Sequence, residues 1–139
     1  MAGTVYVDIV SPQGSVFKGE VRGVKAPGVM GSFTVLHNHA PMIAAFELGQ
    51  LVITDSEGTP FVYATSGGFL EVLNNKVTVL AETAEPASAI DVERAKASEQ
   101  RALERLANAS PEERAKIQAD LDKARNRLRA SISKVGGSR

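Results

Sequence analysis

The stretch FVYATSGGFLEVLNNKVTVLAETAE, residues 61–85, decides the fold of this chain, because strand-forming runs give way there to helical periodicity. Two of its runs are separated only by Asn74-Asn75, and asparagine tolerates positive φ, so this pair predicts a two-residue hairpin turn. The pair Gly67-Gly68 has no Cβ atoms and predicts either a β-bulge or the close approach of a neighbouring backbone. We therefore expect sheet before this stretch and helix after it.

The aromatic residues divide the 139-residue chain into two unequal parts. All seven lie before residue 70, namely Tyr6, Phe17, Phe33, Phe46, Phe61, Tyr63 and Phe69. A small domain needs large apolar side chains to bury enough surface, so only the first part can form a compact core of its own. We expect a β-sandwich domain at residues 1–85 and a helical hairpin at residues 86–139 that packs on another surface.

The first part contains many short strand-forming segments separated by turn formers. The segments are residues 6–10, 16–17, 21–26, 33–36, 42–46, 50–54, 61–64, 68–73 and 76–81. About ten short strands at this spacing predict an antiparallel sandwich or a flattened barrel. The connections between them are too short to hold the crossover helices that join parallel strands.

Two helices are predicted in the second part. Ser88 and Asp91 have the spacing of a capping box, and Ser110, Pro111 and Glu113 form a stronger start signal. Apolar residues then recur on one face of each helix, at Ala95, Ala102, Leu106 and Ala109 and at Ile117, Leu121, Ala124 and Leu128. The short connection predicts an antiparallel hairpin. Its alanine-rich seam buries little area, on the order of a few kcal/mol before entropy is subtracted, so the hairpin can open without unfolding the sheet.

Charge and hydropathy exclude several classes of protein. The 16 basic and 16 acidic residues balance, and residues 1–84 carry 4 basic and 7 acidic residues against 12 and 9 in residues 85–139. This small asymmetry does not make the concentrated basic face that binds nucleic acid, so a nucleic-acid-binding hairpin is the weakest hypothesis. No apolar run reaches the roughly 18 residues that span a bilayer, and we expect no direct membrane insertion.

Motifs for catalysis and metal binding are missing from the sequence. There is no cysteine, and His37 and His39 are the only histidines, so a metal site would lack a third ligand of these types. The sequence contains no GxxxxGK[ST] and no GxSxG motif, and the glycine-rich loop at residues 28–31 is not followed by lysine. We predict a non-enzymatic chain that requires no cofactor and binds no metal.

The loop at residues 27–32 and the basic residues of the helices each allow two interpretations. The loop at residues 27–32 carries the apolar pair Val29 and Met30 between turn formers, which predicts either a contact site or a loop that folds back on its own sheet. Basic side chains form rows along both helices, with Arg94, Arg101 and Arg105 on the first and Lys123, Arg127, Lys134, Arg125 and Arg129 on the second. These rows predict either docking of carboxylates or phosphate, or ordinary charge beside a coiled-coil seam.

The run SGGFLEVLNNKVTVLAETAE, its continuation AIDVERA, and GSFTVLHNHAPMI further upstream resemble the epsilon-subunit family of bacterial F-type ATP synthases. The resemblance is collinear from about Thr4 to about Ile132. The segment His39-Ala40-Pro41 matches the HAP of the family, whereas His37-Asn38 stands where the family usually has Pro-Gly.

This resemblance implies a non-catalytic rotor subunit of the central stalk, which couples proton translocation to ATP synthesis. It implies that the sandwich binds the gamma subunit and the c ring, and that the hairpin either lies on the sandwich or extends into the alpha/beta catalytic hexamer to inhibit ATP hydrolysis. Contact with the c ring would involve Val29, Met30, Gly31 and Ser32, and inhibitory contact with beta would involve Arg125, Arg127 and Arg129. The implied location is peripheral, on the cytoplasmic face of a bacterial plasma membrane.

The resemblance also implies a regulatory ATP site at the folded hairpin. Some family members bind ATP through an I/L-D-x-x-R-A motif, and the matching residues here are Glu85, Ile90, Asp91, Arg94, Ala95, Arg101, Lys123 and Arg127. Lys123 stands where a strong binder has arginine, so we expect weakened binding because lysine lacks the planar fork. Two alternatives are a motif that serves only as a helix start, and a free-standing ATP- or anion-sensing module in which the hairpin acts as a clip.

Overall fold

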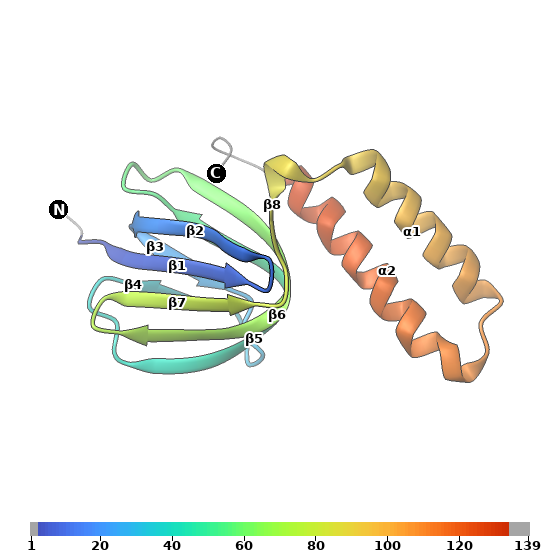
Figure 1. Cartoon of the computed structure of the whole chain (residues 1–139), viewed down its shortest axis with the longest axis horizontal. Coiled ribbons are helices and arrows are strands. Elements are labelled where there is room, and N and C mark those ends of the chain that lie inside the picture. Colours follow the sequence, from blue (N-terminus) through green and yellow to red (C-terminus); the bar gives the residue numbers. More distant parts are fainter. Residues whose placement is uncertain (1–2, 134–139) are drawn as a thin grey trace.

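The computed structural model describes residues 3–133, in which a β-sandwich is followed by a two-helix hairpin (Figure 1). The strands are β1 (Val5–Ser11), β2 (Gly14–Val21), β3 (Gly23–Ala26), β4 (Phe33–Leu36), β5 (Met42–Thr54), β6 (Pro60–Leu73), β7 (Lys76–Ala81) and β8 (Ala84–Pro86). A 3-10 turn, η1 (Ala87–Ala89), leads to the helices α1 (Val92–Ala107) and α2 (Pro111–Ile132). This architecture confirms the predicted fold class.

Two long strands, β5 and β6, contribute to both layers of the sandwich. The hydrogen-bonded order is β2-β1-β7-β6-β5-β3-β4, and β8 pairs with β6. Strand β7 pairs with residues 68–73 of β6, whereas β8 pairs with residues 63–65 of the same strand. The prediction of about ten strands is therefore wrong in number, because the described residues form eight. Residues 47–49 and 65–67, which separate predicted strand segments, lie within the continuous strands β5 and β6 and do not end them.

Gly67 and Gly68 mark the bend of β6. Their φ angles are 123° and 155°, and a Cβ atom on Gly68 would collide with the carbonyl oxygen of Leu80 on β7. The pairing register of β6 with β5 continues unchanged from Phe46↔Gly68 to Gly49↔Thr65. Of the two predicted alternatives, the close backbone approach is therefore confirmed, and the bulge is wrong.

The predicted turn at Asn74 and Asn75 joins β6 to β7. Both residues have positive φ, 50° and 62°, as a type I′ turn requires, so this prediction is confirmed. The sequence did not predict that β7 pairs in parallel with β1, from Tyr6↔Lys76 to Val10↔Leu80. These strands lie far apart in the chain, so no hairpin restricts their relative direction.

The core of the sandwich consists of alternate residues along its strands, whose side chains point inward. Its largest fully buried side chains include Tyr63, Ile9, Leu51, Ile53 and Leu70. Alternation along β1 and β7 places Val5, Val7, Ile9, Val77 and Val79 inside and their neighbours outside. The aromatic-rich first part therefore buries a core that the helices do not complete.

The two helices begin in different ways. Helix α1 is capped by Asp91, whose Oδ1 accepts a hydrogen bond from the Arg94 backbone N–H at 3.1 Å, so the predicted capping box starting at Ser88 is wrong, because Ser88 lies in η1. Helix α2 begins as predicted at Ser110, whose backbone N–H donates to Glu113 Oε1 at 3.1 Å. This hydrogen bond, together with one from the Ser110 hydroxyl, holds the pKa of Glu113 below its ordinary value.

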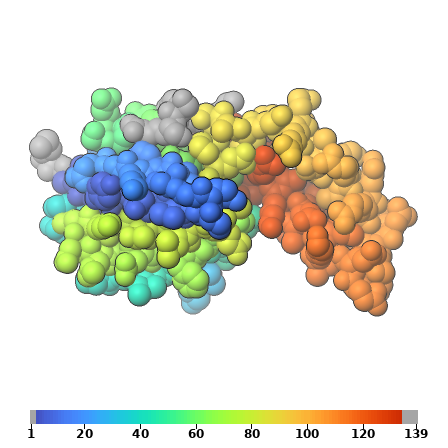
Figure 2. Space-filling model, viewed as in Figure 1, coloured from blue at the N-terminus to red at the C-terminus, as the bar shows by residue number. Residues whose placement is uncertain are grey.

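The hairpin meets the sandwich at one end and projects away from it (Figure 2). Its seam buries the predicted residues Ala95, Ala102, Ile117, Leu121 and Ala124. The end of α2 packs against β5, β6 and η1, whereas the turn between the helices lies far from the sheet (Figure 1). Among the described residues, no helix combines the length and the hydropathy needed to cross a membrane.

Candidate functional site

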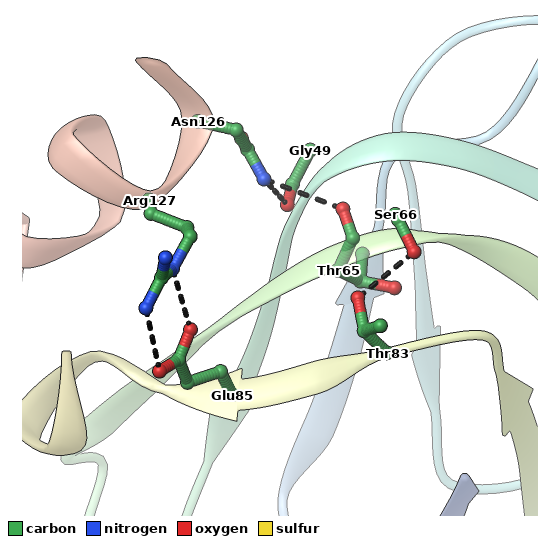
Figure 3. A network of polar contacts seen from close by, with 7 residues as sticks. All are labelled: Gly49, Thr65, Ser66, Thr83, Glu85, Asn126 and Arg127. Carbon is green, nitrogen blue, oxygen red and sulfur yellow. Dashed lines mark hydrogen bonds and ion pairs between the residues drawn. The ribbon is translucent and has the colours of Figure 1, made fainter. Parts of the chain in front are cut away.

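The end of α2 is joined to the sandwich by an apolar contact and an ion pair. Ala130 of α2 packs with Val62, Ala64, Ala87 and Ile90 in a small buried cluster. Beside it, the Arg127 guanidinium binds the Glu85 carboxylate of β8 through two hydrogen bonds, Nε to Oε1 at 2.8 Å and the terminal nitrogen to Oε2 at 3.2 Å (Figure 3). Both side chains are partly buried, which limits the screening of this pair by solvent.

Asn126 adds a second polar contact at the joint. Its side-chain Nδ2 donates to the carbonyl oxygen of Gly49 on β5 at 2.9 Å and to that of Thr65 on β6 at 3.3 Å (Figure 3). The residue is only 2% exposed. No motif or periodicity in the sequence predicted a role for Asn126. The one signal available was an amide side chain four residues before Ala130, on the face of α2 opposite the solvent.

Two hollows meet at Lys123 and Arg127, which line both of them. The first has a volume of about 300 Å³, lies between α2 and the sandwich, and is also lined by Thr65, Ser66, Thr83 and Glu85. The second has a volume of about 380 Å³, lies between the helices, and is also lined by Ser98, Arg101, Arg105 and Asp120. Four basic side chains against one acidic side chain make the second hollow positive, which suits a phosphate-bearing ligand.

The structure brings together only part of the residue set that the resemblance implied for ATP. Glu85, Lys123 and Arg127 surround the first hollow, and Arg101 joins the last two at the second. Ile90 is buried in the apolar cluster with Ala130, Ala95 is buried on α1, and Asp91 caps α1. Arg94 is exposed on the first turn of α1 and lines neither hollow.

The arginines expected to contact beta have different environments. Arg125 pairs with Glu99 across the two helices at 3.1 Å, and Arg127 pairs with Glu85 as described above. Arg129 is exposed and forms no ion pair within residues 3–133. Lys134, which belongs to the same predicted basic rows, lies outside the described residues.

The loop at residues 27–32 is anchored through its backbone and exposed through its side chains. The Val29 N–H donates to the Ala45 carbonyl at 3.2 Å, and the Glu47 N–H donates to the Pro27 carbonyl at 2.9 Å. The side chain of Met30 at the tip is 98% exposed, and Gly31 and Ser32 are exposed beside it. The loop backbone therefore returns to β5, as one of the two alternatives predicted, while its apolar tip points outward. A contact site at this tip stays a prediction.

The two histidines are held near backbone carbonyls. His37 Nδ1 lies 3.0 Å from the Thr4 carbonyl oxygen, and His39 Nδ1 lies 2.8 Å from that of Ala40. Within residues 3–133, no group of three or more His, Cys, Asp or Glu side chains is placed to hold a metal ion. The first contact joins the loop to the N-terminal segment 33 residues away, and the second lies within the turn itself.

The outer face of four neighbouring strands is unusually apolar, which the sequence alone did not predict. Strand register places Ala45, Phe69, Leu80 and Val10 in one row across β5, β6, β7 and β1. Five large apolar side chains on this face are exposed, namely Ile43 (74%), Phe69 (59%), Leu80 (55%), Leu73 (49%) and Tyr6 (36%). Exposed apolar patches of this kind mark contact surfaces in soluble proteins.

Family models match both parts of the chain. Residues 4–87 match the ATP synthase delta/epsilon chain beta-sandwich domain, and residues 88–131 match the delta/epsilon chain long alpha-helix domain. An ATP synthase epsilon chain of Salinibacter ruber is 54% identical over 114 residues, which cover 76% of each chain. That of Desulforamulus reducens is 46% identical over 134 residues, which cover 94% of this chain and 99% of the relative.

Solved structures share the fold at lower identity. A chain in the mitochondrial ATP synthase of Euglena gracilis, a structure of its OSCP, F1 and c-ring, superposes with a TM-score of 0.81 at 19% identity, covering 95% of this chain and 83% of that one. A chain in the central stalk and c-ring of the Tetrahymena thermophila enzyme gives a TM-score of 0.59 at 12% identity, covering 91% of this chain and 95% of that one. Because two family models together span residues 4–131, and because bacterial relatives are about half identical, the chain belongs to the delta/epsilon chain family of ATP synthases.

Proposed function

We propose that this chain is the non-catalytic epsilon subunit of the central stalk, part of the F1 sector of a membrane-associated ATP synthase. The observation that carries the proposal is the family match along both parts of the chain. The subunit joins the rotor through its sandwich and regulates hydrolysis through its hairpin. Its complex lies on the cytoplasmic face of a bacterial plasma membrane, with the chain itself held by other subunits.

The exposed surfaces of the sandwich support two contacts within the rotor. We assign the apolar outer face around Phe69 and Leu80 to the gamma subunit, because burying these side chains in a permanent complex removes their exposure to water. We assign the loop tip at Val29, Met30, Gly31 and Ser32 to the c ring, because an anchored backbone presents an apolar tip there. Both contacts let the rotor turn as one body.

Purification separates this proposal from its alternatives. A rotor subunit copurifies with gamma and the other subunits of the F1 sector, and Phe69→Asp weakens that association while the exposed change Glu71→Asp on the same face preserves it. A free-standing anion sensor purifies alone or with its ligand. A nucleic-acid binder loses its partner steeply as the salt concentration rises.

The hairpin provides the regulatory element of the proposal. Among the described residues, it is attached to the sandwich by the Ala130 cluster, the Asn126 contact and the Arg127–Glu85 pair, so its docked and extended states differ by a small free energy. In the extended state, the exposed Arg129 and the released Arg127 meet acidic segments of beta. Arg125 contributes less directly, because it also holds α1 to α2 through Glu99.

Removal of the hairpin tests this role in the assembled enzyme. A chain ending at Pro86 retains all eight strands, and we expect it to fold, assemble and preserve coupling while ATP hydrolysis rises. Replacement of Arg125, Arg127 and Arg129 by alanine gives a smaller rise. Lys96→Ala serves as the control, because it changes an exposed charge whose one ion pair within residues 3–133 is with Glu93 at 3.8 Å. Unchanged hydrolysis in both test variants removes the hairpin from regulation.

We also propose that the positive hollow between the helices binds regulatory ATP with an affinity between micromolar and millimolar. Arg101, Lys123 and Arg127 supply the charge for the phosphates, but Arg127 is already bound to Glu85, so the nucleotide must compete for it. Titration calorimetry on the isolated chain tests the site. We expect Lys123→Arg to tighten binding, Arg101→Ala to weaken it at least tenfold, and Lys96→Ala to leave it unchanged. If neither wild type nor Lys123→Arg releases heat on titration with ATP, the I/L-D-x-x-R-A motif at residues 90–95 serves only as a helix start.

A further inference from the structure

We propose that Asn126 is the positioning residue that sets the register of the hairpin on the sandwich, by donating its two amide hydrogens to the carbonyl oxygens of Gly49 and Thr65. The inference rests on the proposed regulatory role of the hairpin, and it concerns how the docked state is recognised. The contacts join α2 to two different strands, β5 and β6, across sequence separations of 77 and 61 residues.

The two acceptors are arranged so that one side chain reaches both. Gly49 and Thr65 face each other in the antiparallel pairing of β5 and β6, and their carbonyl oxygens lie 2.9 Å and 3.3 Å from Asn126 Nδ2 (Figure 3). Both acceptors belong to the backbone of a hydrogen-bonded sheet. They therefore mark a fixed position along the strands, which a flexible side-chain acceptor does not.

The acceptor on β5 is held in place from its other side. A Cβ atom on Gly49 would lie 2.7 Å from Pro27 Cβ, so the backbone of β5 packs directly against the ring of Pro27. The neighbouring Glu47 N–H donates to the Pro27 carbonyl at 2.9 Å. Asn126 thus binds a carbonyl whose position the sandwich has already set, and docking of the helix does not require the strand to move.

The neighbours of Asn126 on α2 cannot perform the same role. Ala130, one turn further along, is fully buried and has no polar atom in its side chain. Arg127 contacts the side chain of Glu85, and both groups are roughly one-third exposed, so their pair tolerates displacement. Hydrogen bonds depend on direction as well as distance. A shift of α2 by one residue therefore breaks both hydrogen bonds from Asn126 to the carbonyl oxygens of Gly49 and Thr65.

The same amide also limits the strength of the docked state. Asn126 Oδ1 is buried and has no hydrogen-bond partner among the described protein groups. A buried acceptor without a partner opposes docking, whereas the two N–H donors favour it, and the two effects partly offset each other. Asparagine is also a poor helix former in mid-helix. Asn126 therefore fixes where α2 docks on the sandwich but adds little net stability to the docked state, so the hairpin can still detach.

The test measures docking in the isolated full-length chain. The chain has no cysteine, so Glu57→Cys in an exposed turn of the sandwich and Glu112→Cys at the start of α2 accept a pair of spin labels for distance measurement. In this background, Asn126→Asp removes both donors at nearly constant volume and places a carboxylate against two carbonyl oxygens. We expect the undocked population to rise at least tenfold, as the loss of two hydrogen bonds implies.

A second variant and a control complete the experiment. Asn126→Leu removes the donors and the unpartnered oxygen together without adding charge, and we expect it to widen the distance distribution as well. Asn108→Asp makes the same chemical change in the exposed turn of the hairpin and leaves the distribution unchanged. The melting of the sandwich, followed in each variant, shows that the fold is retained.

Each outcome bears on the inference separately from the proposed function. A wild-type distribution in both Asn126 variants, or tighter docking of Asn126→Leu, overturns the positioning role and leaves the regulatory proposal standing. A widened distribution combined with unchanged ATP hydrolysis in the assembled enzyme supports the positioning role and overturns the regulatory proposal.

Discussion

The interior of the sandwich and the seam of the hairpin are built from different side chains. The sandwich buries Tyr63, Ile9, Leu51, Ile53 and Leu70 almost completely. The hairpin seam buries mostly alanines, at positions 95, 102 and 124, with Ile117 and Leu121 as its large members. An alanine side chain removes far less apolar area from water than leucine or isoleucine, so the two regions differ in stabilisation per residue.

This difference separates a rigid platform from an element that can change state. A sheet with a closely packed interior holds one conformation, whereas two helices with a thin seam and a small joint lie within a few kcal/mol of alternatives. The ion pairs between the helices, Arg125–Glu99 and Arg105–Asp120, do not make the hairpin as stable as the sandwich, because these pairs are largely at the surface. Matched substitutions in the two regions test the comparison.

The largest expected effect comes from Leu51→Ala in the sandwich. Leu51 is fully buried on β5, and truncation leaves a cavity that a two-layer sheet cannot collapse around. We expect the sandwich to lose about 2–5 kcal/mol of unfolding free energy, measured by chemical denaturation with a sheet-specific signal. A loss below about 1 kcal/mol would contradict the description of this interior as rigid.

The matched change Leu121→Ala in the seam is expected to act on the hairpin alone. Leu121 lies between two helices that can move closer and fill the cavity. We therefore expect the hairpin to lose about 2 kcal/mol of unfolding free energy, the lower end of the range for such truncations. Amide hydrogen exchange should accelerate along α1 and α2 while the strands keep their protection. Equal acceleration in the sandwich would mean that the two regions unfold as one unit.

A smaller effect is expected from Arg127→Ala at the joint. The change leaves the partly buried Glu85 without its partner, which we expect to cost about 1 kcal/mol of docking free energy. Exchange of amides around Ala64 and Ile90 reports this local loosening. Arg129→Ala is the control, because its exposed side chain forms no ion pair within residues 3–133, and it should leave the exchange rates unchanged.

The smallest effect concerns the start of α2 and its dependence on pH. The pKa of Glu113 is lowered by hydrogen bonds from the backbone and side chain of Ser110, so its carboxylate stabilises the folded state above the ordinary glutamate pKa. That contribution is lost as the pH falls through the lowered value. Glu113→Gln should therefore fray α2 slightly at neutral pH and differ less from wild type in acid, as helical circular dichroism across a titration can measure. A constant difference would assign the effect to helix propensity.

The sequence predicted the local parts of the fold well. The turn at Asn74-Asn75, the start of α2 at Ser110 and the apolar seam positions all depend on neighbours within a few residues, and the structure confirms them. The wrong predictions concern the ends of strands and the start of α1, which depend on contacts with residues distant in the sequence. Strands β5 and β6 continue through residues 47–49 and 65–67 because they pair with each other along most of their length, and α1 begins directly after its cap Asp91 because η1 occupies the residues before that cap.

The candidate site was predicted only in part. The charges of Glu85, Lys123 and Arg127 were identified, and they meet at one place. Arg94 was assigned to the same set but lies outside both hollows, because its position on α1 depends on how the hairpin projects from the sandwich. The apolar outer face was missed, because it appears only when strand register places Ala45, Phe69 and Leu80 side by side.

The sequence by itself determined the division into sheet and hairpin, since aromatic content, turn formers and helix caps are properties of short segments. Only the tertiary structure decided the parallel pairing of β1 with β7 and the contact of Asn126 with Gly49 and Thr65. Every residue carries a backbone carbonyl, so no sequence pattern marks those two as acceptors. They become a recognition site only because the folded sheet presents them together to a helix that lies 61 and 77 residues further along the chain.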